Sequence, residues 1–114
     1  MILKKYKVPR VDIPYVLNKG QLSNSDFFII RYRKNNENFS RFRVIISKKL
    51  EAKAVKRNKL RRQIYEAIRL NIENSIENND YILIPKKKIT EKKYQEILED
   101  IRDNIINTKH GSIE

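Results

Sequence analysis

Six of ten side chains are cationic in the stretch Lys53-Ala54-Val55-Lys56-Arg57-Asn58-Lys59-Leu60-Arg61-Arg62. This stretch opens a longer segment, residues 52–74, in which apolar side chains recur at helical spacing: Leu60, Ile64, Ala67 and Ile68. At about 100° per residue, a second ridge runs beside the apolar one and contains Asn58, Arg61, Arg62, Tyr65 and Arg69. Guanidinium groups suit phosphate oxygens and a tyrosine ring can stack on a base. We therefore expect a long helix that presents this ridge to a nucleic acid.

The charge of the chain is large and unevenly placed. The 114 residues include 26 Lys and Arg against 14 Asp and Glu, a formal net charge of +12. Residues 1–62 contain 18 basic and 4 acidic side chains, whereas residues 63–114 contain 8 and 10. The many Lys, Ile and Asn residues also fit the coding bias of an AT-rich genome, but that bias does not favour Arg. Nine of the ten Arg lie between Arg10 and Arg69, a segregation that favours a polyanionic partner over a merely solvated surface.

Composition excludes several classes of protein. There is no Cys for a disulfide or a thiolate site, and the single His, His110, cannot supply a zinc cluster. Charged residues interrupt every apolar run, so we expect no membrane span, no secretory signal and a cytoplasmic location. Nothing reads as an interdomain linker, which predicts one domain over residues 1–114, with a basic arm at 1–10 and a frayed tail at 107–114.

Two further helices are expected. Asp12 can cap a short helix that has Pro14 in its first turn and ends at Gly20. Its apolar stripe is Ile13, Val16 and Leu17. Thr90 can cap the last helix, whose core face is Tyr94, Ile97, Leu98, Ile101 and Ile105.

Three strands are expected around the long helix. Residues 26–34 and 41–47 alternate in polarity and are joined by the turn-prone residues 35–38, and residues 81–84 form a buried strand ended by Pro85. In the first two strands one face is apolar: Phe28, Ile30, Tyr32, Phe42, Val44 and Ile46. If those sets pack together as a hairpin, the opposite face has four arginines beside two apolar residues: Arg31, Arg33, Arg41, Arg43, Phe27 and Ile29. The elements together predict a small α+β domain with helices packed on a sheet.

The motif residues resemble those of a known family. The signature of the bacterial ribonuclease P protein subunit is similar to Ser47-Lys48-Lys49 followed by Ala54-Val55-x-Arg57-Asn58-x-Leu60-Arg61-Arg62-x-x-x-Glu66. The resemblance covers roughly residues 5–106. It implies the element order α-β-β-β-α-β-α with a mixed sheet, like the second domain of ribosomal protein S5, and a left-handed βαβ crossover.

The resemblance also implies a function. Members of this family bind a large catalytic RNA, and the complex removes the 5′ leader from precursor tRNA, with one protein expected per RNA. Carried over to this chain, the resemblance implies that five residues contact the RNA subunit: Lys53, Arg57, Asn58, Arg61 and Arg62. The basic segment and the helix ridge add five further candidates for the same contact: Lys48, Lys49, Lys56, Tyr65 and Arg69. A cleft between the motif helix and the sheet is implied for the single-stranded leader. Strand alternation and the first helix supply the candidates for it: Ile13, Leu17, Phe27, Ile29, Arg31, Arg33, Arg41 and Arg43.

No residue of this chain is predicted to be catalytic. RNA hydrolysis by a protein alone needs a pair of tuned acid and base groups or a carboxylate cluster for metals. The acidic residues of the basic half are scattered: Asp12, Asp26, Glu37 and Glu51. We therefore expect charge screening and substrate positioning, with Mg²⁺ bound mainly by the RNA subunit. A metal site on the protein itself stays open.

Two other interpretations have the same composition. One is a small ribosomal-type structural RNA-binding protein without a role in cleavage, and the other is a DNA-binding domain. The spacing of the SKK and AVxRNxxRR motifs favours ribonuclease P over both. A helix-turn-helix is disfavoured because the basic helix follows two strands and exceeds 20 residues.

Overall fold

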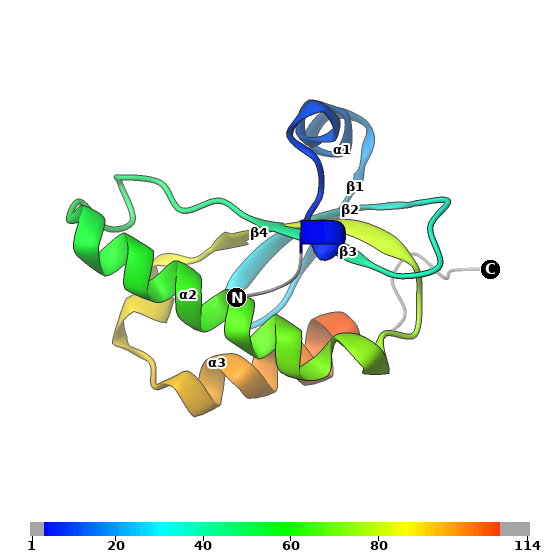
Figure 1. Ribbon diagram of the computed structural model, residues 1–114. Coiled ribbons are helices and arrows are strands. Elements are labelled where there is room, and N and C mark those ends of the chain that lie inside the picture. Colours follow the sequence, from blue (N-terminus) through cyan, green and yellow to red (C-terminus); the bar gives the residue numbers. More distant parts are fainter. Residues whose placement is uncertain (1–3, 108–114) are drawn as a thin grey trace.

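A four-stranded sheet organises the computed structural model, which describes residues 4–107 (Figure 1). The strands are β1 (Gln21–Asn24), β2 (Phe28–Lys34), β3 (Arg41–Val44) and β4 (Asn79–Pro85). The α-helices are α1 (Ile13–Lys19), α2 (Ala54–Asn71) and α3 (Tyr94–Ile101). Short helical turns add Lys4–Tyr6, Arg10–Asp12, Ile72–Asn74, Lys87–Glu91 and Arg102–Ile106. The element order α-β-β-β-α-β-α and the α+β class agree with the prediction.

The spatial order of the strands is β1-β2-β4-β3, so the predicted hairpin of β2 with β3 is wrong. β4 lies between them, antiparallel to β2 from Phe28↔Pro85 to Lys34↔Asn79 and parallel to β3. The physical reason is hydrophobicity, because β4 is the most apolar strand and is buried along nearly its whole length. α2 is the crossover between the parallel neighbours β3 and β4.

Helices cover both faces of the sheet. In Figure 1, α2 and α3 lie below the sheet and α1 lies above it. The main core fills the space between the sheet and the α2–α3 layer and includes Phe28, Ile30, Phe42, Val44, Ile64, Ile68, Tyr81, Leu83, Ile97 and Ile101. A smaller cluster lies under α1 and consists of Val8, Val16 and Ile82. The predicted alternation of β2 and β3 is confirmed, because their apolar side chains are buried in the main core and their arginines lie on the opposite side of the sheet, toward α1.

The first helix ends where only glycine fits. A Cβ atom at Gly20 would lie 2.3 Å from the Val16 carbonyl oxygen and 2.9 Å from that of Tyr32. The next residues form β1, a polar strand for which no range was predicted, and pairing with β2 holds it in the sheet.

Neither predicted N-cap side chain forms a cap. Asp12 makes no capping hydrogen bond, and its carboxylate lies 3.7 Å from Arg41 instead. Thr90 sits inside the turn Lys87–Glu91 and donates to the Lys87 carbonyl at 3.0 Å. α3 begins four residues later, where the Glu96 carboxylate accepts the Lys93 N–H at 3.1 Å.

The N-terminal arm is part of the fold. Lys7 forms a parallel bridge with Phe42, and the buried Val8 donates its N–H to the Phe42 carbonyl at 3.1 Å. Tyr6 packs edge-on against Phe39 with ring centroids 5.2 Å apart. Most of the predicted tail, with His110, lies outside the described residues.

Candidate nucleic-acid interface

The N-terminal half of α2 is a strongly cationic surface. Lys53, Lys56, Asn58, Lys59 and Arg62 are exposed, as are Lys48 and Lys49 in the preceding loop. The Arg62 side chain forms no hydrogen bond or ion pair with residues 4–107. The first turn of α2 contains no acidic residue, and the positive end of the helix dipole repels the cations gathered there. An anion bound at this end would remove both sources of repulsion.

Two residues of the motif are held by local hydrogen bonds. The Arg57 guanidinium donates to the carbonyls of Glu51 and Ala52 at 3.0 and 2.8 Å, which fixes the loop that enters α2. Arg61 donates to the side-chain oxygen of Asn58 at 2.8 Å. These bonds leave other donors of both guanidinium groups available, so the pairs order the ridge without neutralising it.

The ridge is less cationic at its far end. Arg69 forms an exposed ion pair with Glu66, one turn away on α2. Hydrogen bonding to Arg69 lowers the pKa of the Glu66 carboxyl below its ordinary value. Glu66 therefore offsets the charge of Arg69, whereas Arg62 has no acidic partner among residues 4–107.

Tyr65 does not belong to the exposed ridge, contrary to the prediction. Its side chain is 2% exposed, and its hydroxyl oxygen accepts the Val44 N–H at 3.0 Å. The Lys7 ammonium lies 4.9 Å from the ring centroid. The middle of α2 packs along β3, which turns this side of the helix toward the sheet, so Tyr65 cannot stack on an RNA base.

Two of the four sheet arginines form hydrogen bonds within the protein. Arg41 donates twice to the Asp80 carboxylate at 2.7 Å, and the two side chains are only 16% and 9% exposed. The Asp80 hydrogen bond raises the pKa of Arg41 above its ordinary value. Arg43 donates to the Val8 carbonyl at 3.2 and 2.7 Å. Arg41 and Arg43 thus hold β4 and the N-terminal arm to β3.

The other two arginines lie on the α1 face with several of the predicted apolar residues. Arg31 is half-buried between Leu22 of β1 and Ile82 of β4, and its side chain makes no hydrogen bond or ion pair with the described residues. Ile29 is 38% exposed on the same face of β2. Ile13 and Leu17 of α1 are half-buried and pack against the small cluster of Val8, Val16 and Ile82. These side chains lie on the side of the sheet that α1 covers, which we call the α1 face.

Phe27 lies elsewhere, contrary to the prediction. It is 9% exposed in the main core, with the ammonium groups of Lys88 and Lys92 each 5.8 Å from its ring centroid. Residue 27 precedes β2, and its N–H donates to the buried Asp100 carboxylate at 3.0 Å, so strand alternation does not apply to it.

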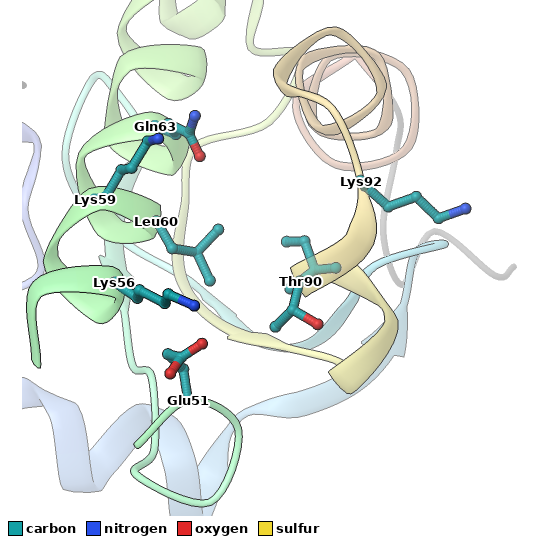
Figure 2. Close-up of a pocket in the computed structure, with 8 residues that line it drawn as sticks. Glu51, Lys56, Lys59, Leu60, Gln63, Thr90 and Lys92 are labelled. Carbon is teal, nitrogen blue, oxygen red and sulfur yellow. The ribbon is translucent and has the colours of Figure 1, made fainter. Parts of the chain in front are cut away.

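The predicted cleft between α2 and the sheet is filled by the main core. The cations that remain accessible belong instead to the start of α2 and to the α1 face. Sequence patterns also missed a shallow pocket of about 320 Å³ beside α2, lined by Glu51, Lys56, Lys59, Leu60, Gln63, Ile89, Thr90 and Lys92. Figure 2 shows Leu60 and Thr90 directed into it from opposite sides.

Tyr15 is the other residue that sequence reasoning missed. It is 51% exposed, and the Arg33 guanidinium lies 4.0 Å from its ring centroid. Helical phase could have found it, because Tyr15 lies off the stripe that Ile13, Val16 and Leu17 turn toward the sheet.

The described residues offer no evident metal centre or membrane span. Within residues 4–107, no three His, Cys, Asp or Glu side chains come together as metal ligands. No helix in that range is both long and apolar enough to cross a bilayer.

Comparisons with known proteins agree on one family. The family model for ribonuclease P matches residues 8–109. The ribonuclease P protein component of Fusobacterium nucleatum is 37% identical over 98 residues, covering 82% of this chain and 87% of that protein. The corresponding protein of Thermotoga maritima is 29% identical over 98 residues, covering 86% and 83%.

Solved structures give the same result. The ribonuclease P protein of T. maritima superposes with a TM-score of 0.81 at 26% identity, covering 92% of this chain and 98% of that one. The Staphylococcus aureus protein superposes with a TM-score of 0.72 at 25% identity, covering 86% and 90%.

Proposed function

This chain belongs to the ribonuclease P protein family, and we propose that it is the subunit that helps a catalytic RNA remove the 5′ leader from precursor tRNA. The observation that carries the proposal is the start of α2, where exposed cations gather at the positive end of a helix without acidic neighbours in its first turn. This arrangement suits the phosphates of a structured RNA. One protein binds one RNA in this proposal, and the complex works in the cytoplasm.

The RNA subunit docks on the N-terminal half of α2 and the loop before it. Lys48, Lys49, Lys53, Lys56 and Arg62 are exposed there and supply charge. The bonded pair of Asn58 with Arg61 presents donors at fixed positions. Each phosphate contact releases condensed counterions, so the affinity falls steeply as salt is added.

The leader binds on the α1 face. Arg31 and Arg33 offer guanidinium groups for phosphates, and Ile29 offers exposed apolar surface. Arg41 and Arg43 contribute indirectly, because their hydrogen bonds hold the strand and arm that frame this face. The leader and the RNA subunit therefore contact different surfaces of one small domain.

The chemical step belongs to the RNA in this proposal. We assign Mg²⁺ to the RNA subunit and no step of hydrolysis to a side chain of this protein. The protein screens the electrostatic repulsion between the RNA subunit and precursor tRNA. It also orients the leader for cleavage.

Reconstitution tests the proposal. Precursor tRNA with a leader should be cleaved to the mature 5′ end when the protein, the ribonuclease P RNA of the same cell and Mg²⁺ are combined. The RNA alone at low salt should be slower, and the protein alone should be inactive. Cleavage by the purified protein, or no effect of the protein on the RNA, would contradict the proposal.

A further inference from the structure

Tyr15 is unusual among the aromatic residues of this protein. All ten aromatic residues lie in the described part of the chain, and Tyr15 is the most exposed of them, at 51%. The other nine are buried or half-buried, several of them in the main core. Burial of aromatic surface is a large source of stability, so a tyrosine left 51% exposed contributes little to packing.

The Tyr15 ring is held in place by an arginine. The Arg33 guanidinium of β2 lies 4.0 Å from the ring centroid, which is a cation–π contact. Arg33 lies near the end of β2, an inner strand of the sheet, and is opposite Asp80 of β4 in the strand register, so the contact fixes the ring relative to a rigid element. The remaining exposed surface of the ring is thus oriented before any ligand arrives, which reduces the entropy lost on binding.

The position of Tyr15 on α1 separates it from the residues already assigned. Ile13 and Leu17 pack toward the sheet on one flank of the helix, whereas Tyr15 and Lys19, one turn apart, lie on the other flank. Lys19 is exposed and can contact a phosphate near the ring. Two nearby carboxylates are directed toward Arg41: Asp80 at 2.7 Å and Asp12 at 3.7 Å.

We propose that Tyr15, supported by Arg33, is a stacking platform for an unpaired RNA base. Aromatic rings and guanidinium planes stack on bases of single-stranded RNA, and flanking cations bind the phosphates on either side. The inference rests on the proposed function, because it assumes an RNA partner. The base comes from the leader of precursor tRNA or from a single-stranded loop of the RNA subunit.

The test uses the reconstituted complex and four proteins: the wild type, Tyr15→Ala, Tyr15→Phe and Tyr15→Leu. Affinities are measured for precursor tRNA with leaders of increasing length, for mature tRNA and for the RNA subunit. Tyr15→Ala should lower the affinity for one single-stranded partner by about five- to tenfold, which is the lower part of the range expected for the loss of one stacked base. Tyr15→Phe should bind like the wild type, and Tyr15→Leu should bind like Tyr15→Ala, because stacking needs the ring.

The separate affinity measurements distinguish the two possible sources of the base. A loss of affinity confined to precursor tRNA with longer leaders assigns the base to the leader, and a loss of affinity confined to the RNA subunit assigns the base to that RNA. Equal affinities for all four proteins, or an equal loss in Tyr15→Phe, would overturn the platform. Ile76→Ala removes a side chain that is 49% exposed on the loop after α2 and serves as the control for loss of apolar surface. Thermal melting of each variant confirms that it folds.

Failure of this inference can be distinguished from failure of the proposed function. If the wild-type protein does not improve cleavage by the RNA subunit, the proposed function is wrong whatever Tyr15 does. If the wild type does so and the Tyr15 variants match it in every arm, only the stacking platform is wrong.

Discussion

Tyr65→Phe tests a position where the sequence pattern and the structure disagree. The side chain is 2% exposed, and its hydroxyl oxygen accepts the Val44 N–H at 3.0 Å. Phenylalanine keeps the ring and removes the acceptor, which leaves a buried backbone N–H without its partner. An unsatisfied group of this kind costs about 1–3 kcal/mol of unfolding free energy. For a domain of this length, that corresponds to a melting temperature lower by roughly 4 to 12 °C.

The assay pairs thermal and urea unfolding with RNA-subunit binding. The affinity of folded Tyr65→Phe for RNA should stay within about twofold of the wild type, because the lost hydroxyl faces β3. Tyr15→Phe makes the same chemical change at an exposed ring and should leave the melting temperature unchanged. Normal stability combined with weakened RNA binding in Tyr65→Phe would show instead that the Tyr65 hydroxyl contacts RNA and not Val44.

Two further outcomes concern buried polar groups. Asp80→Asn removes the closer carboxylate partner of the partly buried Arg41 and leaves only Asp12 at 3.7 Å, so urea unfolding should show a loss of about 3 kcal/mol of unfolding free energy. Asp103→Asn, at an exposed pair with Arg102, should change the stability little. Similar losses in both variants would count against a structural role for Arg41. Burial raises the pKa of Tyr81 from 10.0 to about 12. The stability supplied by the neutral phenol is therefore complete below pH 10 and declines as the pH rises toward 12, because the unfolded chain releases this proton first. Ultraviolet absorbance should show a late tyrosine titration whose amplitude falls by one group in Tyr81→Phe, and an undiminished amplitude would contradict the assignment.

Local periodicity predicted most elements correctly. The apolar stripe of α2 and the alternation of β2 and β3 are short-range patterns that follow from helix and strand geometry alone. The same patterns could not show that β4 enters between β2 and β3, because pairing of distant strands depends on the whole core. The family motif supplied the missing third strand before α2, but not its range.

Errors in the candidate site have specific causes. Tyr65 was assigned to the exposed ridge because helical periodicity alone does not show that β3 lies beside this side of α2. Phe27 was misplaced because Asp100, 73 residues away, turns the chain before β2 begins. Asp100 also accepts from the Ser25 hydroxyl at 2.7 Å, and nothing local to residues 25–27 predicts such a buried partner.

The most direct test of the account is the salt dependence of RNA-subunit binding, which counts phosphate contacts at the start of α2. The logarithm of the association constant falls linearly with the logarithm of salt concentration, by about 0.7 to 0.9 for each contact. Arg62→Ala should reduce that slope by roughly one contact, because Arg62 is exposed and unpaired among residues 4–107. Arg102→Ala, at an exposed arginine paired with Asp103, should leave the slope unchanged. An unchanged slope in Arg62→Ala, or equal changes in both variants, would contradict docking of the RNA on α2.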